Sequence, residues 1–188
     1  MNKYKLARII SEISNGFLTM ILTPILGILS SPIKLSQKVG FSVAYFLATT
    51  LPFLILKRMG RISDYEFTDR RERPPYFISI SILYGLFYLF LKNFQLPILS
   101  DISLALFLVS TVISFITLFW KISGHMTFST LLFCTLAYLY SPLFFLLFLF
   151  SPFIGWSRIV LKKHNIAQVI AGTLVPFVIC ILIYWVFW

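Results

Sequence analysis

The chain contains two histidines, His125 and His164, and each stands beside residues that can bind an anion. His125 follows Ser123 and Gly124, which supply a small hydroxyl and an unshielded backbone N–H. N–H groups of this kind at the N-terminus of a helix form a cradle for phosphate. His125 would then stand where it can protonate a leaving oxygen. Taken alone, a histidine at the end of a membrane helix is more often a cap or an interfacial contact.

His164 lies at the end of a second polar segment. Ser157 and Arg158 precede it, with five residues between Arg158 and His164, and Gln168 follows four residues later. If a helix ran through this segment, these side chains would lie close to one of its faces. Arginine offers two parallel donors that suit phosphate oxygens, a nearby histidine can attack phosphorus, and a side chain at i+4 can hold its other ring nitrogen. The competing interpretation is an interfacial helix whose basic residues anchor it to lipid headgroups.

A third polar segment, residues 69–75, carries Arg70 and Arg73. These arginines are three residues apart and could face the same way on a helical turn. A charged loop on the cytoplasmic side of a membrane is the commoner explanation of such a run.

Long apolar blocks separate the polar segments and must position them. Hydrophobic residues make up 59% of the chain and charged residues 12%, whereas a soluble domain carries about a quarter charged residues. Residues 126–156 contain no charged side chain. A bilayer solvates such a sequence far better than water does, so the sequence predicts an integral membrane protein.

The apolar blocks predict an all-α, polytopic membrane helix bundle, because a helix needs about 20 apolar residues to cross the hydrocarbon core. Ser141-Pro142 divides the longest block, either as a turn, which gives seven transmembrane helices, or as a kink, which gives six. We expect one membrane domain over residues 1–188, with an N-terminal helical hairpin (1–57) before a core (58–188). The basic start at Met1 is expected to precede a retained first helix, not a cleaved signal peptide. The seven expected segments are 8–29, 40–57, 76–92, 99–119, 126–140, 142–161 and 166–187.

Together the three polar segments resemble the type 2 phosphatidic acid phosphatase (PAP2) superfamily, which implies a PAP2-like core. The signatures of that superfamily are a Lys, six residues, then Arg-Pro; a Pro-Ser-Gly-His; and a Ser-Arg, five residues, His, three residues, Asp. Arg73-Pro74 matches the end of the first signature, and Ser123-Gly124-His125 matches three positions of the second. Ser157-Arg158 and His164 match the third at the family's spacing. The motifs occur in the family's order, and the resemblance covers residues from about 57 to 175.

Three positions depart from the signatures. Ile122 replaces the proline, Glu66 stands where the first lysine would align, and Gln168 replaces the aspartate. Arg70 and Lys121 are candidates for the task of the missing lysine. The run from His164 to Val169 looks like the His-Thr-x-x-Gln-Val of dolichyl-diphosphatase-like and related prokaryotic branches, where glutamine is a normal occupant. We therefore expect an active enzyme.

The resemblance implies a role for each matched residue. His164 would be the nucleophile that forms a phosphohistidine, held by Gln168, and His125 would be the general acid. The chemistry would need neither a metal nor another cofactor, because arginines neutralise the developing charge. The expected phosphate-binding residues are Arg70, Arg73, Lys121, Ser123, Gly124, Ser157 and Arg158.

The net charge of +10 suits anionic headgroups, and no stretch indicates a nucleic-acid-binding fold. With seven helices, two crossings separate successive polar segments, so all three would lie on one face. That face would carry every Lys and Arg except Lys34, Lys38 and Lys92. The positive-inside rule then predicts an active site on the cytoplasmic face, and the resemblance to prokaryotic branches favours a prokaryotic plasma membrane.

The sequence favours a lipid substrate because apolar, aromatic helices flank the motifs. Either an isoprenyl phosphate or diphosphate, or a glycerophospholipid phosphate, fits this composition. Two other functions stay open: a phosphotransferase that passes phosphate from His164 to another lipid, and an inactive lipid-binding or transport protein of the same fold. The inactive alternative rests on Gln168 and Glu66.

Overall fold

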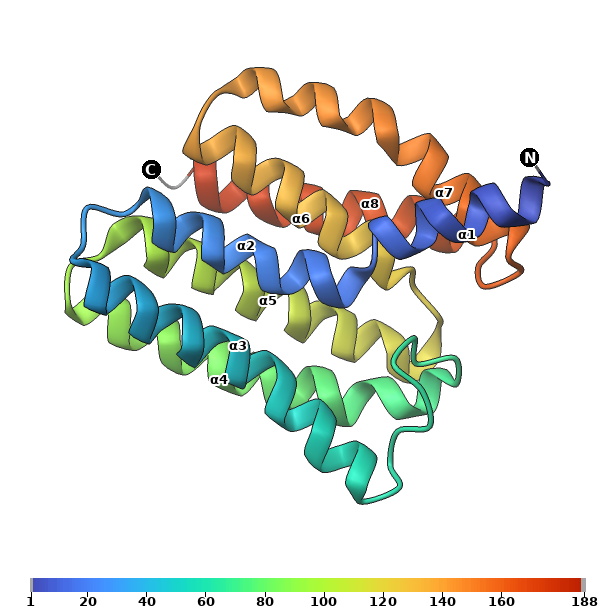
Figure 1. Ribbon diagram of the computed structural model, residues 1–188, viewed down its shortest axis with the longest axis horizontal. Coiled ribbons are helices and arrows are strands. Elements are labelled where there is room, and N and C mark those ends of the chain that lie inside the picture. The colour runs from blue at the N-terminus through green and yellow to red at the C-terminus, as the bar shows by residue number, and fades with distance from the viewer. Residues whose placement is uncertain (1, 187–188) are drawn as a thin grey trace. The chain divides into compact units, whose positions relative to one another are not determined.

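The computed structural model of the chain describes residues 2–186, and every regular element in this range is a helix (Figure 1). This confirms the predicted all-α fold class. Met1 and the expected end of the last segment at residue 187 lie outside the described residues. The elements are α1 (Lys3–Ile13), α2 (Gly16–Ser30), α3 (Leu35–Arg58), η1 (Arg70–Glu72), α4 (Arg73–Asn93), α5 (Pro97–Phe119), α6 (Gly124–Leu139), η2 (Pro142–Phe150), α7 (Ser151–Val160), α8 (Ile166–Ile181) and η3 (Leu182–Val186).

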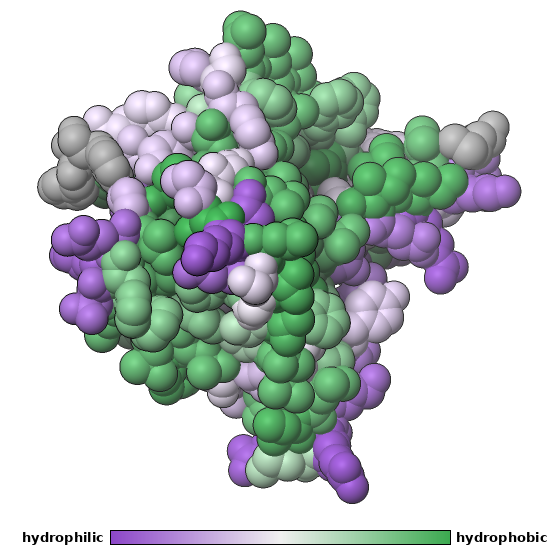
Figure 2. All heavy atoms as spheres, turned by 60° about the vertical axis from the view of Figure 1, so that its left-hand side comes forward, coloured by the Kyte–Doolittle hydropathy of each residue, from purple (hydrophilic) through white to green (hydrophobic). Residues whose placement is uncertain are grey.

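Six helical stretches in the described residues are long and apolar enough to cross a membrane, and α6 is a shorter apolar helix. α1 and α2 together make the first of these stretches, Lys3–Ser30, and η2 with α7 makes another. Large hydrophobic side chains are exposed on nearly every helix, and apolar residues cover much of the face in Figure 2. Such a surface is stable in hydrocarbon and unfavourable in water. The chain is therefore an integral membrane protein.

The turn predicted at Ser141-Pro142 is present. α6 ends at Leu139, and the Ser141 hydroxyl accepts a hydrogen bond from the Leu143 N–H at 3.3 Å as the next helix begins. The rings of Phe133 and Phe148 then meet edge to face, with centroids 5.6 Å apart. α6 and η2 thus lie side by side, as Figure 1 shows, and the alternative of one kinked helix is wrong.

The first apolar segment contains a break that the sequence analysis did not predict. α1 ends at Ile13, and Asn15 caps the start of α2 with its side-chain oxygen, which accepts the Phe17 N–H at 2.8 Å. The Ser14 hydroxyl donates to the Ile10 carbonyl at 2.7 Å. Serine and asparagine favour such local hydrogen bonds at helix ends, and here they divide an otherwise apolar run.

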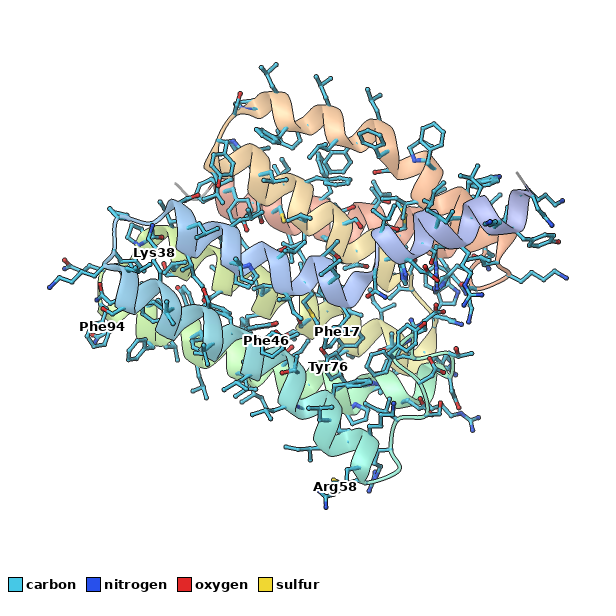
Figure 3. All side chains as sticks on the ribbon, viewed as in Figure 1. Phe17, Lys38, Phe46, Arg58, Tyr76 and Phe94 are labelled. Carbon is cyan, nitrogen blue, oxygen red and sulfur yellow. The ribbon has the colours of Figure 1, made fainter. Side chains whose placement is uncertain are left out.

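The described chain divides into two compact units, one formed by residues 1–23 and 121–188 and the other by Pro24–Trp120. In the second unit, hydroxyl pairs join its helices in the interior. Tyr45 on α3 hydrogen-bonds Ser103 on α5, and Thr49 on α3 hydrogen-bonds Tyr84 on α4 at 2.6 Å. Tyr76, labelled in Figure 3, donates to the Thr49 carbonyl at 3.2 Å. Such pairs give each hydroxyl a hydrogen-bond partner, which the hydrocarbon of the lipid cannot provide.

The first unit contains α1, α6, η2, α7 and α8. α6 packs along α8, and α1 packs along α7. Away from the polar segments, Tyr138 stacks on Tyr184 at 4.4 Å between ring centroids, and the Thr135 hydroxyl lies 3.1 Å from the Tyr184 hydroxyl. The expected division of the chain after residue 57 stays a prediction.

Candidate active site

The start of α6 presents the first anion-binding group. Ser123 is the N-cap, and its carbonyl accepts both the backbone N–H and the hydroxyl of Thr127, at 3.0 and 2.9 Å. Gly124 is the first helical residue, and a Cβ built there would meet no atom within 4 Å. The first N–H groups of a helix have no acceptor within the helix. The open space beside Gly124 therefore lies next to a backbone that favours an anion.

The segment from Arg158 to His164 contains a tight turn, in the break expected between residues 161 and 166, so its side chains do not lie along one continuous helical face. α7 ends at Val160, and Lys162 adopts the left-handed conformation with φ of 55°. The Lys163 N–H and the His164 N–H both donate to the Arg158 carbonyl, at 3.0 and 3.3 Å. The pattern is a Schellman motif with lysine at the usual glycine position. It brings His164 back beside Arg158 without a continuing helix.

His164 is held in one tautomer by Gln168. The Gln168 side-chain oxygen lies 3.0 Å from His164 Nδ1 and also accepts the backbone N–H of Asn165 at 3.3 Å. A backbone N–H only donates, so this atom is the amide oxygen and Nδ1 must donate to it. The lone pair of the ring then lies on Nε2, the nitrogen suited to attack. Asn165 completes the arrangement, because its side chain accepts the Gln168 N–H at 2.9 Å and caps α8.

α8 brings the second and third motifs into direct contact. The Ser123 N–H donates to the Gln168 carbonyl at 3.2 Å. One turn further along α8, a Cβ built on Gly172 would lie 2.8 Å from the Ser123 carbonyl oxygen. Only glycine allows this approach of the two backbones. His125 and His164 are therefore carried by elements that touch each other.

Ser11 is a site residue that the sequence analysis missed. It lies on α1, is 4% exposed, and its hydroxyl is 3.4 Å from His125 Nε2. The same hydroxyl accepts a hydrogen bond from Arg158 Nη1. The nearby sequence holds no motif that marks this serine, and its spacing of four from the buried Ala7 is typical of any helix face. One oxygen atom is thus within reach of both the candidate acid and the candidate phosphate-binding arginine.

The surroundings of the site within the first unit are cationic. Arg158 is 2% exposed, and both histidines are 8% exposed. Glu12 is the sole carboxylate side chain in residues 1–23 and 121–188, and it pairs with Arg8 at 3.0 Å. In the described residues no group of three or more His, Cys, Asp or Glu is placed to hold a metal ion. The charge and the donors of this unit favour an anion.

The other expected phosphate-binding residues have structural contacts of their own. In the second unit, Arg70 Nη1 donates to the carbonyls of Thr117 and Leu118, at 3.2 and 2.6 Å, and so caps the C-terminus of α5. Arg73, also of that unit, is buried, and its Nε donates to the Phe67 carbonyl at 3.1 Å.

In the first unit, the Ser157 hydroxyl donates to the Ile154 carbonyl at 2.7 Å, and Lys121 lies in the loop before α6. Contact of Arg70, Arg73, Ser157 and Lys121 with phosphate stays a prediction.

The structure is thus a helical membrane protein in which two buried histidines accompany a buried arginine. The family model of the PAP2 superfamily matches residues 17–188, so the chain belongs to that superfamily, whose members are generally phosphatases. The match includes α3 and most of α2, which the motifs alone did not cover, whereas Ser11 precedes it. Comparisons with curated proteins and with solved structures found no match. The narrower likeness to dolichyl-diphosphatase-like branches stays a prediction.

Gly172→Ala tests the close approach of α8 to α6. We expect the added methyl group to displace the Ser123 backbone, to destabilise the protein by about 1–3 kcal/mol and to lower any activity. Gly40→Ala is the matched control, because a Cβ there meets no atom within 4 Å, and it should leave the protein as stable or slightly more so. Thermal unfolding in detergent measures both. Equal melting temperatures for the two variants would contradict the packing described.

Ser11→Ala tests whether the missed serine positions the site. We expect phosphate release to fall about tenfold, the effect of losing one hydrogen bond to a charged group, while the unfolding temperature stays the same. Ser11→Thr should restore most of the rate, because it keeps the hydroxyl. Ser110→Ala, which removes a buried hydroxyl with no hydrogen-bond partner in the described residues, is the control. Equal rates of phosphate release by Ser11→Ala and Ser110→Ala would show that Ser11 does not position the site.

Proposed function

We propose that the chain is a lipid phosphate phosphatase that works through a phosphohistidine at His164. The observation that carries this proposal is the single oxygen of Ser11, which both His125 Nε2 and Arg158 Nη1 reach. A phosphoryl or leaving oxygen in the same region could be bound by the arginine and protonated by the histidine. A substrate oxygen would displace the serine hydroxyl or share its partners.

In the first half of the reaction, His164 Nε2 attacks phosphorus and the bond from phosphorus to the leaving oxygen breaks. His125 gives its proton to that oxygen, so an alcohol or a lipid monophosphate leaves. Gln168 holds Nδ1 and keeps the lone pair on Nε2. Arg158 and the N-terminus of α6 stabilise the negative charge that develops on the phosphoryl oxygens. The resemblance to the PAP2 superfamily implies that Arg73 also stabilises this charge.

In the second half, water attacks the phosphohistidine and the P–N bond breaks. His125, now neutral, accepts the proton of the water as a general base. Inorganic phosphate leaves, and both histidines return to their starting states. No step requires a metal ion, because the charge is stabilised by arginine and backbone donors.

The substrate is proposed to be a lipid because apolar helices that suit a bilayer surround the site. An isoprenyl phosphate or diphosphate and a glycerophospholipid phosphate share the required chemistry, a phosphate on a hydrocarbon-bearing alcohol. The charge distribution favours a site toward the cytoplasm, and the resemblance to prokaryotic branches favours a prokaryotic plasma membrane. Lys162 and Lys163, which follow α7, would then contact anionic headgroups on that side.

Phosphate release by the purified protein tests the proposal. We expect wild-type protein to release inorganic phosphate from lipid phosphates in mixed micelles. His164→Ala should abolish release, and His125→Ala should lower it by about 10²–10⁴-fold, the usual contribution of general acid catalysis. A phosphorylated lipid acceptor in place of free phosphate would indicate a transferase. Wild-type protein that releases nothing from either lipid class, although correctly folded, would indicate an inactive member of the superfamily.

Labelling of single cysteines tests the proposed orientation. Cys134 and Cys180 are buried and free, so they should add little background. We expect Lys162→Cys to react with a membrane-impermeant maleimide only after cells are permeabilised, and Lys38→Cys, on the expected opposite face, to react in intact cells. The reverse pattern would place the active site outside.

A further inference from the structure

The first unit contains an apolar cavity of about 480 Å³ that the catalytic chemistry does not use. Its walls come from α1, α2, α6, the end of η2 and α7. Apolar side chains such as Leu132, Phe133 and Ile154 form most of the lining, and its polar members are hydroxyls without charge. A cavity of this size is within the range of ligand sites, about 300–1,000 Å³.

The cavity begins one helical turn from the active site on three separate helices. On α6, the lining residues Ser129 and Leu132 lie four and seven positions after His125, on the same helix face. On α7, Ile154 lies four positions before Arg158. At the end of α1, the C-cap residue Ser14 lies three positions after Ser11. Because one turn of helix advances about 5.4 Å, the cavity runs on from the site.

The outer side of the cavity is open. Ile13 is 71% exposed, and Phe150 and Phe153 are each 58% exposed, although all three line the cavity. In a membrane protein, exposed apolar side chains of this kind face hydrocarbon. A hydrocarbon chain could therefore pass from the bilayer into the cavity without crossing a polar barrier.

We propose that this cavity binds the hydrocarbon chain of the phosphorylated substrate. The part of the chain that it binds is the part closest to the phosphate headgroup. The proposal rests on the proposed function and adds the element that selects a lipid over a water-soluble phosphate ester. The chain lies along α6 and holds the phosphate against His125 and Arg158, so its binding energy positions the reacting group. The α1 wall precedes the region matched by the PAP2 model, so it is a feature of this chain beyond that match.

A second cavity provides a matched control. It lies in the other unit between α3 and α4, also measures about 480 Å³, and is lined by apolar side chains that include Leu83 and Leu86. Leu132 and Leu83 are both half-buried leucines on the wall of their own cavity. Replacing either leucine with the same larger residue therefore adds the same side-chain volume, at Leu132 to the cavity of the first unit and at Leu83 to the cavity of the second.

The experiment compares Leu132→Trp with Leu83→Trp on phosphate monoesters of increasing chain length, supplied below their micellar concentration, and on a water-soluble aryl phosphate. For the wild type we expect each added methylene to lower KM up to about fourfold until the cavity is full. Leu132→Trp should remove most of this dependence, raise KM for long chains at least tenfold, and leave kcat/KM for the aryl phosphate unchanged. Leu83→Trp should behave like the wild type. Parallel series with acyl and with isoprenyl chains show which source of hydrocarbon fits better.

Photolabelling gives a readout that does not depend on turnover. A lipid phosphate with a diazirine near the headgroup should label the peptides around Leu132 in His164→Ala protein, and excess unlabelled lipid phosphate should suppress the label. Labelling that resists this competition would mean that bulk lipid fills the cavity, and an unchanged chain-length dependence in Leu132→Trp would equally overturn the proposal. Both outcomes leave the proposed function intact as long as wild-type protein still releases phosphate. A wild type without phosphatase activity, together with competed labelling, would overturn the proposed function alone.

Discussion

The contact between the start of α6 and the side of α8 is the constraint on which the active site depends. Ser123 donates its N–H to the Gln168 carbonyl, and Gly172 admits the Ser123 carbonyl where any side chain would collide with it. Gln168 also holds His164, and Ser123 precedes His125 by two residues. One backbone contact therefore sets the positions of both histidines. Close approach through glycine is the usual way for membrane helices to gain contact, because lipid supplies no hydrophobic drive between them.

Gln168 replaces a carboxylate with an amide, and the geometry shows what this exchange keeps and what it loses. The amide oxygen still orients His164 and still fixes the tautomer with the lone pair on Nε2. It lacks the negative charge that would stabilise a cationic ring. In serine proteases, loss of the equivalent carboxylate costs about 10⁴-fold, and much of that cost reflects a wrong tautomer. Here the tautomer is retained, so the glutamine is compatible with an active enzyme.

Much of the fold could be predicted because it depends on local properties of the sequence. The length of each apolar block predicts a membrane helix, and the turn at Ser141-Pro142 follows from a proline that cannot continue the hydrogen bonding of α6. The break at Asn15 was missed because two polar residues inside an apolar run are also common within helices. The break between residues 161 and 166 was expected, but the tight turn within it was not, because nothing in the composition marks Lys162 as a left-handed residue just after α7.

The sequence by itself determined that the chain lies in a bilayer, roughly where its helices run and which reactive groups it carries. Hydropathy, helix signals and motif spacing are all properties of neighbouring residues. Tertiary structure alone decided which groups meet. Ser11 reaches His125 and Arg158 across 114 and 147 positions of sequence, a separation that leaves no local pattern to read. Arg70, a predicted phosphate ligand, also caps α5 through carbonyls 47 and 48 residues away, a contact that no local pattern indicates. The cavity beside the histidines likewise exists only where side chains from five elements come together.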